Sequence, residues 1–326
     1  MKSYKILLQV TIFLALAFIL LPCAGQAKDA TTPASKAAAT SSKNDFYVLN
    51  FPPGPALAEI LWNTAAEDKI KGKGRVLATG KVKVPKNQPL EIVLTVDSLD
   101  HMEAMEKLAG LPVRNLIASK LDFTDEHLQH FKDFKSLSYI NLDQTLVTDK
   151  SLPIIAGLPF LVSLRLSGTD VIGSNFEALS KLQLLDRLNI HGISLKPGYL
   201  KKLKATFVYL KELDISATNL THDDASALAY CTVLKGLDVR GNKGFDDSCI
   251  TFLSKLKMLK SIDVTDTRVT EKSLAVLSQL PKLRSLVVRA RSFWVSGEPK
   301  ETNGRLTVVD SASKSNATID IFRPLH

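Results

Sequence analysis

The sequence predicts an α/β protein built as a solenoid of about eight similar units. A pattern of the form L-x-x-L-x-L recurs between residues 113 and 288 with steps of 24 or 25 residues. Each copy is followed by a polar turn and by apolar residues at helical spacing, so we expect one strand and one helix per unit. A fixed period of this length indicates units that bury their apolar faces against their neighbours. The first apolar position falls at Val113, Leu137, Leu161, Leu185, Leu210, Leu234, Leu259 and Leu283.

The strand of each unit is predicted from the second and third apolar positions. These positions are two residues apart, so both side chains point to one face of a strand and the alternate residues point to the other. The second position holds Leu116, Ile140, Leu164, Leu188, Leu213, Leu237, Ile262 and Leu286. The third holds Ala118, Leu142, Leu166, Ile190, Ile215, Val239, Val264 and Val288.

The start of each helix is predicted from a Thr or Asp that follows an apolar residue after the turn. Such residues fit the N-cap, where a side-chain oxygen accepts N–H groups that the first helical turn leaves unpaired. An acidic residue next in sequence suits the positive end of the helix dipole. The polar stretch 264–283 is therefore expected to be a turn and a helix cap, not a catalytic cluster. The capping residues are Thr124, Thr148, Thr221, Asp246 and Thr270, and the acids are Asp125, Asp149, Asp223, Asp247 and Glu271.

These units resemble the leucine-rich repeat family over roughly residues 113–295. The nearer likeness is to the Thr-bearing V-T-D-x-S-L repeats of exported bacterial proteins, as in the segment that begins at Val147, and through them to the cysteine-containing repeats of F-box adaptors. The resemblance implies a right-handed, horseshoe-shaped solenoid with a parallel sheet on its concave side and helices on its convex side.

The turn of these units departs from the family pattern. The family's usual Asn or Cys is mostly replaced by Thr, whose hydroxyl can bond local backbone. Ile193 and Arg291 hold the same slot in two units and cannot bond in that way. The other residues at the slot are Thr145, Thr169, Thr218, Asn242 and Thr267.

Residues 1–27 have the pattern of an export signal. Lys2 and Lys5 precede an apolar run at residues 6–21, and small residues follow up to Ala27. The run is shorter than the ~20 residues that span a bilayer, so we expect cleavage and a secreted, periplasmic or cell-surface protein. Cleavage would lower the formal net charge from +9 by two units. An uncleaved membrane anchor and lipidation of Cys23 stay open as alternatives.

The segments before the array are expected to be a tether and a cap. Residues 28–44 are small, polar or charged, which predicts a disordered linker. Residues 45–98 are expected to form a β-rich N-terminal cap. Within it, residues 80–96 would form a hairpin and residues 50–62 its edge segment.

The array and its far end follow. The array is expected to span residues 99–295, and residues 296–326 are expected to supply two short strands as a C-terminal β cap. Terminal caps are needed because an open solenoid end exposes core.

Motifs of known enzymes and metal sites fail on their spacing. Residues 74–80 are one residue too long for a phosphate-binding loop, and Val82 stands where Ser or Thr would bind magnesium. His127 and His130 are three residues apart and the acid precedes the first, so the H-E-x-x-H zinc motif fails. We therefore expect no enzyme activity, no catalytic residue, no metal site and no cofactor.

The residues that alternate with the core positions are expected to line the concave face and to bind a partner. They are polar and mixed in charge, and they lack the basic stripe and stacking aromatic rings of a nucleic-acid site. The candidate partner-binding residues are Arg165, Arg187, His191, Asp214, Asp238, Arg240 and Asp263.

Three of these candidates form a row of aspartates. Asp214, Asp238 and Asp263 hold the same slot in consecutive strands, which predicts stacked carboxylates ~4.8 Å apart. The row has three interpretations: the family's usual residue with its charge offset by water and Arg240, an acidic strip for a basic partner segment, or a calcium site. A flat row suits calcium poorly, because the ion takes about six to eight converging oxygens.

The sequence thus predicts an exported, non-enzymatic protein-interaction module that is monomeric and binds no nucleic acid. It would contact a membrane only through an uncleaved signal. Solenoids present extended surfaces suited to protein partners. The alternatives are a ligand- or metal-binding receptor, an unrecognised enzyme, or an intracellular substrate adaptor of the ubiquitin-ligase type.

Overall fold

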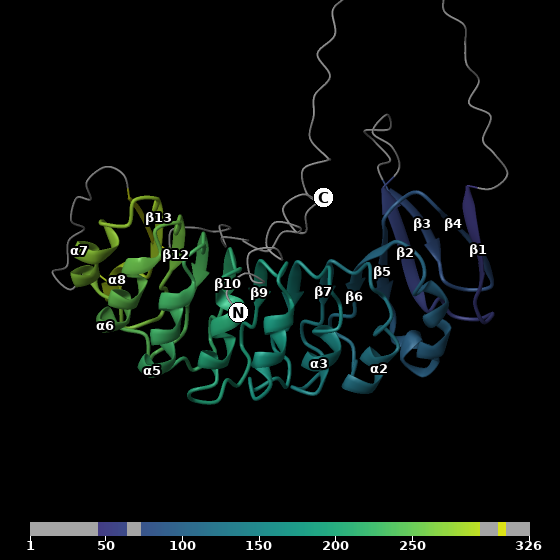
Figure 1. The fold of residues 1–326 in the computed structure, drawn as a ribbon, viewed down its shortest axis with the longest axis horizontal. Coiled ribbons are helices and arrows are strands. Elements are labelled where there is room, and N and C mark those ends of the chain that lie inside the picture. Colours follow the sequence, from purple (N-terminus) through teal and green to yellow (C-terminus); the bar gives the residue numbers. More distant parts are fainter. Residues whose placement is uncertain (1–44, 64–72, 294–305, 311–326) are drawn as a thin grey trace, which may run out of the picture. The chain divides into compact units, whose positions relative to one another are not determined.

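The computed structural model describes residues 45–63, 73–293 and 306–310. All of them belong to one unit, Lys43–His326, and the expected signal and linker lie outside the described residues. The described strands form a sheet of 12 strands and a second sheet of two strands. Figure 1 shows the strands of the larger sheet side by side, with short helices following one another along the row.

The larger sheet is parallel from β5 to β14, and each strand in this part pairs with the next along the chain. The second apolar position of each unit pairs with that of the next, from Leu116 to Leu286, which confirms the predicted register. The strands are β5 (Leu90–Leu94), β6 (Val113–Ile117), β7 (Tyr139–Asn141), β8 (Ser163–Arg165), β9 (Arg187–Asn189), β10 (Glu212–Asp214), β11 (Gly236–Asp238), β12 (Ser261–Asp263), β13 (Ser285–Val288) and β14 (Thr307–Asp310).

The core lies between this sheet and the helices. The second and third apolar positions of all eight units are at most 3% exposed, as expected if each unit covers the apolar face of its neighbour. Phenylalanines fill the space between strand and helix. Those that are fully buried are Phe123, Phe131, Phe134, Phe176, Phe207, Phe245 and Phe293.

The helices are short, and many are single 3₁₀ turns. The predicted caps Thr124, Thr221, Asp246 and Thr270 each accept a backbone N–H in the first helical turn. The prediction for Thr148 is wrong, because α3 begins at Ser151 with Lys150 as its N-cap, and the Thr148 hydroxyl accepts the N–H of Lys150 at 3.2 Å. The α-helices are α2 (Asp125–Gln129), α3 (Ser151–Ile155), α4 (Lys204–Phe207), α5 (His222–Ala225), α6 (Asp247–Ile250), α7 (Leu274–Leu277) and α8 (Ala290–Phe293). The 3₁₀ helices are η1 (Val96–Ala104), η2 (Glu106–Leu108), η3 (Phe176–Lys181), η4 (Leu200–Leu203), η5 (Ser226–Tyr230), η6 (Thr251–Lys255) and η7 (Glu271–Ser273).

Carboxylates at the helix starts join neighbouring units. Asp125 accepts the backbone N–H of Thr148 at 2.9 Å, the hydroxyl of Thr148 at 2.6 Å and the hydroxyl of Ser151. Asp247 makes the same three bonds to residues 270–273 at 2.8, 2.7 and 2.5 Å. In both cases the acid at the start of one helix therefore holds the Thr and Ser at the start of the next. The carboxylates that bridge units in this way, the turn aspartates, are Asp125, Asp149 and Asp247.

In each turn after β6 to β12, the residue at one slot lies in the left-handed region with a φ between 52° and 71°, a conformation that costs glycine nothing and other residues some strain. The turn after β10 contains a second such residue, Asn219, with a φ of 57°. At Gly192 and Gly241 the turn is relieved of that strain, whereas Ala217 adopts it between them. The residues at this slot are Lys120, Gln144, Gly168, Gly192, Ala217, Gly241 and Asp266.

The threonine in the turn forms a hydrogen bond within its own unit. The hydroxyls of Thr145, Thr169, Thr218 and Thr267 donate to the carbonyl three residues earlier at 2.6–2.8 Å, which confirms the local bond expected of them. Asn242 bonds across two units instead. Its amide donates to the carbonyls of Val239 at 2.9 Å and of Ile215, in the preceding unit, at 2.8 Å. Its oxygen accepts the N–H of Leu220 at 2.9 Å.

The N-terminal β region differs from the expected hairpin. β4 (Lys81–Pro85) pairs with β1 (Phe46–Asn50) in the small sheet, whereas β5 joins the large one. The hairpin prediction for residues 80–96 is therefore wrong. The reason is that β5 extends the repeat register, because buried Ile92 pairs with Leu116 as though it belonged to another unit.

The expected edge segment is also misplaced. β2 (Ala58–Asn63) lies between β5 and β3 (Lys73–Leu77), antiparallel to both, so β3 is the outer strand. At the other end β14 supplies one of the two C-terminal strands expected. The second expected strand, at residues 317–322, lies outside the described residues.

Candidate partner-binding face

The outward positions of β9 to β12 bring the predicted aspartates together. Asp214 pairs with Asp238 across β10 and β11, and Asp238 pairs with Asp263 across β11 and β12. The register confirms that the three residues stack on adjacent strands. They are called the sheet aspartates below.

The carboxylate of each sheet aspartate is hydrogen-bonded within its own unit. Its carboxylate accepts the backbone N–H two residues further along, as the short Asp side chain favours in turns. Asn141 and Asn189 accept in the same way at 2.9 and 2.8 Å, so Asp or Asn serves as a turn acceptor in five of the eight units. The three aspartate bonds are Asp214 to Ser216 at 3.0 Å, Asp238 to Arg240 at 3.0 Å and Asp263 to Thr265 at 2.9 Å.

The sheet aspartates are also nearly buried. They are 4–7% exposed although they point away from the apolar core. Burial, followed by the negative charge of Asp214, raises the pKa of Asp238 to about 7. Burial likewise raises the pKa of Asp263. A carboxylate in this position is costly to ionise and offers a partner little surface.

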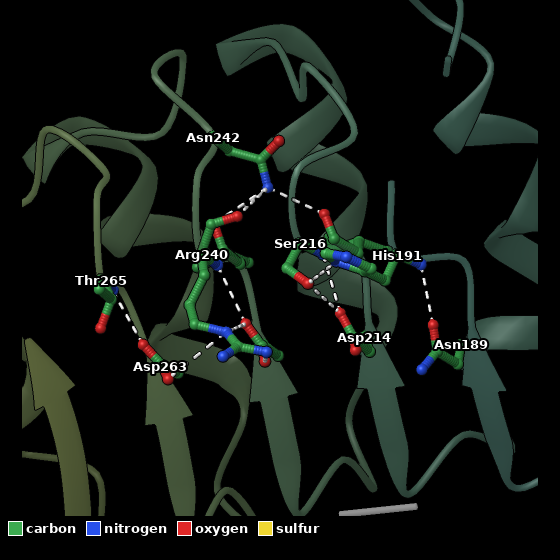
Figure 2. Close-up of polar contacts among 11 residues, drawn as sticks. Asn189, His191, Asp214, Ser216, Arg240, Asn242, Asp263 and Thr265 are labelled. Carbon is green, nitrogen blue, oxygen red and sulfur yellow. Dashed lines mark hydrogen bonds and ion pairs between the residues drawn. The ribbon is translucent and has the colours of Figure 1, made fainter. Parts of the chain in front are cut away.

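Arg240 lies between two of these carboxylates, as Figure 2 shows. Its guanidinium contacts Asp238 at 2.8 Å and Asp263 at 3.6 Å, and its Nε donates to Asp238 at 3.0 Å. This half-buried cation offsets part of the like-charge repulsion, as the sequence suggested. The aspartates in turn fix the guanidinium on the face.

His191 is oriented by a chain of hydrogen bonds (Figure 2). Ser216 donates its hydroxyl proton to Asp214 at 2.5 Å, so the Nδ1–H of His191 is the donor to the serine oxygen at 2.7 Å. In a nucleophilic triad the histidine lies between the serine and the acid. Here the serine occupies the middle and is 1% exposed. The arrangement therefore orients an exposed imidazole and does not activate the hydroxyl.

The two remaining candidates lie apart from the sheet aspartates. Arg165, on β8, pairs with Asp143 of β7 through Nε at 2.7 Å. Arg187, on β9, lies 3.7 Å from Asp186 and beside Glu212 of β10. The predicted residues thus form a face of mixed charge over β8 to β12.

Glu212 also faces outward on β10, although it is not among the candidate residues chosen from the sequence. Burial raises its pKa to about 7, against the lowering effect of Arg187. Its Oε2 is buried and has no hydrogen-bond partner among the described residues. The outward alternation places it on the face. Its burial depends on neighbouring side chains that no local pattern specifies.

The described residues contain neither a metal-binding cluster nor a helix that could span a membrane. No group of three or more His, Cys, Asp or Glu side chains there is placed to hold a metal ion. His127 caps α2, and His130 contacts Glu106 at 2.7 Å. In the same residues, no helix is long and apolar enough to cross a bilayer.

Among known proteins, this chain is similar to solved structures at low sequence identity. No family model matches the chain, and no curated protein matches it. An internalin (inlF) from Listeria monocytogenes is 16% identical with a TM-score of 0.47, covering 65% of this chain and 71% of that chain. An internalin C2 (inlC2) from the same organism is 20% identical with a TM-score of 0.45, covering 61% and 80%. That the chain forms a solenoid of leucine-rich units follows from its own strand register and buried repeat positions, and not from these similarities.

Proposed function

We propose that this chain is an exported, non-enzymatic leucine-rich repeat protein that binds a protein partner with the outer face of its parallel sheet. The observation that carries the proposal is a set of polar side chains held in place on β8 to β12. Arg165, Arg240 and the His191 ring are each fixed by a carboxylate, directly or through a serine. Side chains fixed before binding lose less entropy when a partner arrives.

The cations and the acids of this face have different roles. Arg165, Arg187 and Arg240 are half-buried and His191 is exposed, so these four offer contact area. The sheet aspartates act on the partner through Arg240 and the turn backbone. The partner that complements such a face presents acids or backbone carbonyls to the arginines.

A paired variant tests the face once a partner is isolated from the extracellular fraction. Arg187→Gln with Arg240→Gln should weaken binding at least about tenfold, because two cations are lost from the centre of the contact. Calorimetry measures the change. Arg268→Gln is the control, because Arg268 is an exposed cation away from this face. Equal affinities for the double variant and the wild type would place the site elsewhere.

Asp238→Asn separates a positioning role from direct contact. If the aspartate acts through Arg240, the variant changes affinity slightly and keeps the salt dependence of association. If the aspartates form an acidic strip for a basic partner, the variant slows association and weakens that salt dependence. Association rates at low and high salt distinguish the two outcomes.

Export has its own test. N-terminal sequencing of the chain recovered outside the cytoplasm should begin near Lys28, since residues 1–27 carry the signal pattern. A chain that is soluble in the cytosol and retains Met1 would contradict export. A membrane-bound chain that retains Met1 would support the anchor at residues 6–21.

A further inference from the structure

A row of exposed apolar side chains follows the amino-terminal edge of the parallel sheet. In four consecutive units the residue before the first apolar core position is large, apolar and 37–52% exposed. The same slot holds Ser136 in one unit and Lys282 in another, so the fold does not require an apolar residue there. Contiguous exposed apolar surface of this kind marks an interaction site. The row consists of Phe160, Leu184, Tyr209 and Val233.

A row of cations runs beside it. Lys211, Lys235, Lys260 and Arg284 each follow the first apolar core position of four successive units. Their backbones are joined by N–H···O bonds of 2.7–2.8 Å, so the side chains arise from adjacent strands. Lys211 contacts Asp186 at 2.8 Å, and it alone among the four forms an ion pair within the described part of the chain. Like charges this close favour an anionic partner that offsets their repulsion.

A groove of about 510 Å³ continues the apolar row toward the helices. Val208, Tyr230 and Phe252 line it, together with Lys204 and Lys255, and no acid is among its lining residues. The ammonium of Lys204 lies 5.0 Å from the centre of the Tyr230 ring. The groove joins the row through the chain, because Val208 precedes Tyr209 directly. The apolar surface is thus bordered by lysines on two sides.

The backbone at this edge is not available to a peptide. The N–H groups of Lys235, Lys260 and Arg284 already donate to the carbonyls of the preceding units. A peptide that adds a strand needs unpaired backbone groups of this kind. A strand-adding peptide is therefore excluded, and this edge offers its apolar and positively charged side chains. Apolar insertion and positive charge are the two terms that hold a protein on an anionic bilayer.

We propose that this edge, the basic ledge, docks on an anionic lipid surface. It is defined by Phe160, Leu184, Tyr209 and Val233 with Lys211, Lys235, Lys260 and Arg284. The apolar side chains enter the boundary between headgroups and acyl chains, and the long lysine side chains reach the phosphates from either side. This contact lies outside the sheet-face residues of the proposed function and does not depend on them.

A tryptophan probe on the ledge tests the contact in the full chain. The chain has two tryptophans of its own, so the probe is placed in a chain that carries Trp62→Phe and Trp294→Phe. In that chain the emission of Phe160→Trp should shift to the blue and be quenched by brominated acyl chains in vesicles of phosphatidylcholine and phosphatidylglycerol. In vesicles of phosphatidylcholine alone it should do neither. Leu146→Trp is the matched control, because Leu146 is 47% exposed and follows the opposite end of a strand. A local probe reports on the ledge whether or not residues 1–27 also bind lipid.

Charge variants test the basic row through the same probe. Lys235→Gln with Lys260→Gln should raise the concentration of anionic lipid needed for half-maximal quenching of Phe160→Trp roughly thirtyfold, because each lysine near the surface contributes about 1 kcal/mol. Lys243→Gln with Lys272→Gln removes the same charge from exposed positions elsewhere and should change it little. Equal loss in both pairs would assign the effect to net charge and overturn the ledge.

The remaining outcomes also overturn the proposal. A Phe160→Trp probe that ignores anionic vesicles excludes the bilayer as the partner. If that probe instead responds to poly-glutamate, and Lys235→Gln with Lys260→Gln abolishes the response, the ledge binds an acidic protein segment. Quenching that is equal at Phe160→Trp and Leu146→Trp would mean that the chain adsorbs in no fixed orientation.

Discussion

The sheet aspartates and the turn aspartates follow the same repeat but have opposite effects on the fold. The turn aspartates accept hydrogen bonds from the next unit, and the sheet aspartates accept them from their own. Burial acts to raise the pKa of Asp125, but the bonds from Ser151 and Thr148 outweigh it and the pKa is lowered. At Asp238 burial and Asp214 prevail and the pKa rises. The donors around a carboxylate, and not its residue type, decide whether its charge stabilises the repeat.

The largest effect is expected when an acid is placed on the core side of the sheet, one residue before a sheet aspartate. Leu237→Asp places a carboxylate beside Asp238 on the core side of β11, where Leu237 is 1% exposed. Burying an unpaired charge should cost several kcal/mol, enough to prevent folding of neighbouring units as well. Circular dichroism and thermal unfolding measure the loss. An unchanged melting temperature would mean that the strand register is wrong.

Removing a turn aspartate should have the next largest effect. Asp125→Ala leaves the N–H and hydroxyl of Thr148 and the hydroxyl of Ser151 without their acceptor, which should cost about 1–3 kcal/mol in the free energy of unfolding. Asp223→Ala is the control, because its side chain is 73% exposed and pairs only with Lys201 at the surface. Urea denaturation compares the two. Equal losses would show that the bonds between units contribute nothing beyond a surface charge.

Removing the charge of a sheet aspartate should be mildly stabilising, and only at higher pH. The pKa of Asp238 is about 7 in the folded chain against an ordinary 3.8, so the folded state binds more protons between those values and stability falls as pH rises through that window. Asp238→Asn removes this titration. It should match the wild type near pH 4 and exceed it at pH 8 by on the order of 1 kcal/mol.

A control separates this effect from general loss of acid. Asp266→Asn is the control, because it removes the same charge from a side chain that is 41% exposed and contacts Arg289. Urea denaturation across pH 4–8 gives both curves. A profile for Asp238→Asn that runs parallel to the wild type would contradict the raised pKa.

The fold could be predicted where one unit contains its own signal. Leu237 and its counterparts define the strand register because the apolar spacing repeats, and Thr124 or Thr270 defines a helix start because capping is local. The N-terminal strands could not be assigned in that way. β4 and β5 both alternate, and only the register between Ile92 and Leu116 places them in different sheets.

The site was predictable by position and not by environment. The alternation placed Asp214, Asp238 and Asp263 on one face, and the register confirms it. Their burial was not foreseen, because it depends on side chains of adjacent strands. For the same reason Asp125 was expected to serve the dipole of its own helix, whereas its partners Thr148 and Ser151 lie one period away.

The difference between Thr218 and Asn242 has a consequence for how such a chain changes over generations. A turn hydroxyl that bonds its own carbonyl leaves no polar group of a neighbouring turn dependent on it. The Asn242 turn is tied to the one before it, since the N–H groups of Thr218 and Leu220 both donate to its side-chain oxygen. Deleting the Asn242 unit would leave these two buried N–H groups without that partner. Among the turn slots, the threonine turns therefore constrain their neighbours least when the array gains or loses length, and the pair joined at Asn242 is inherited as a block.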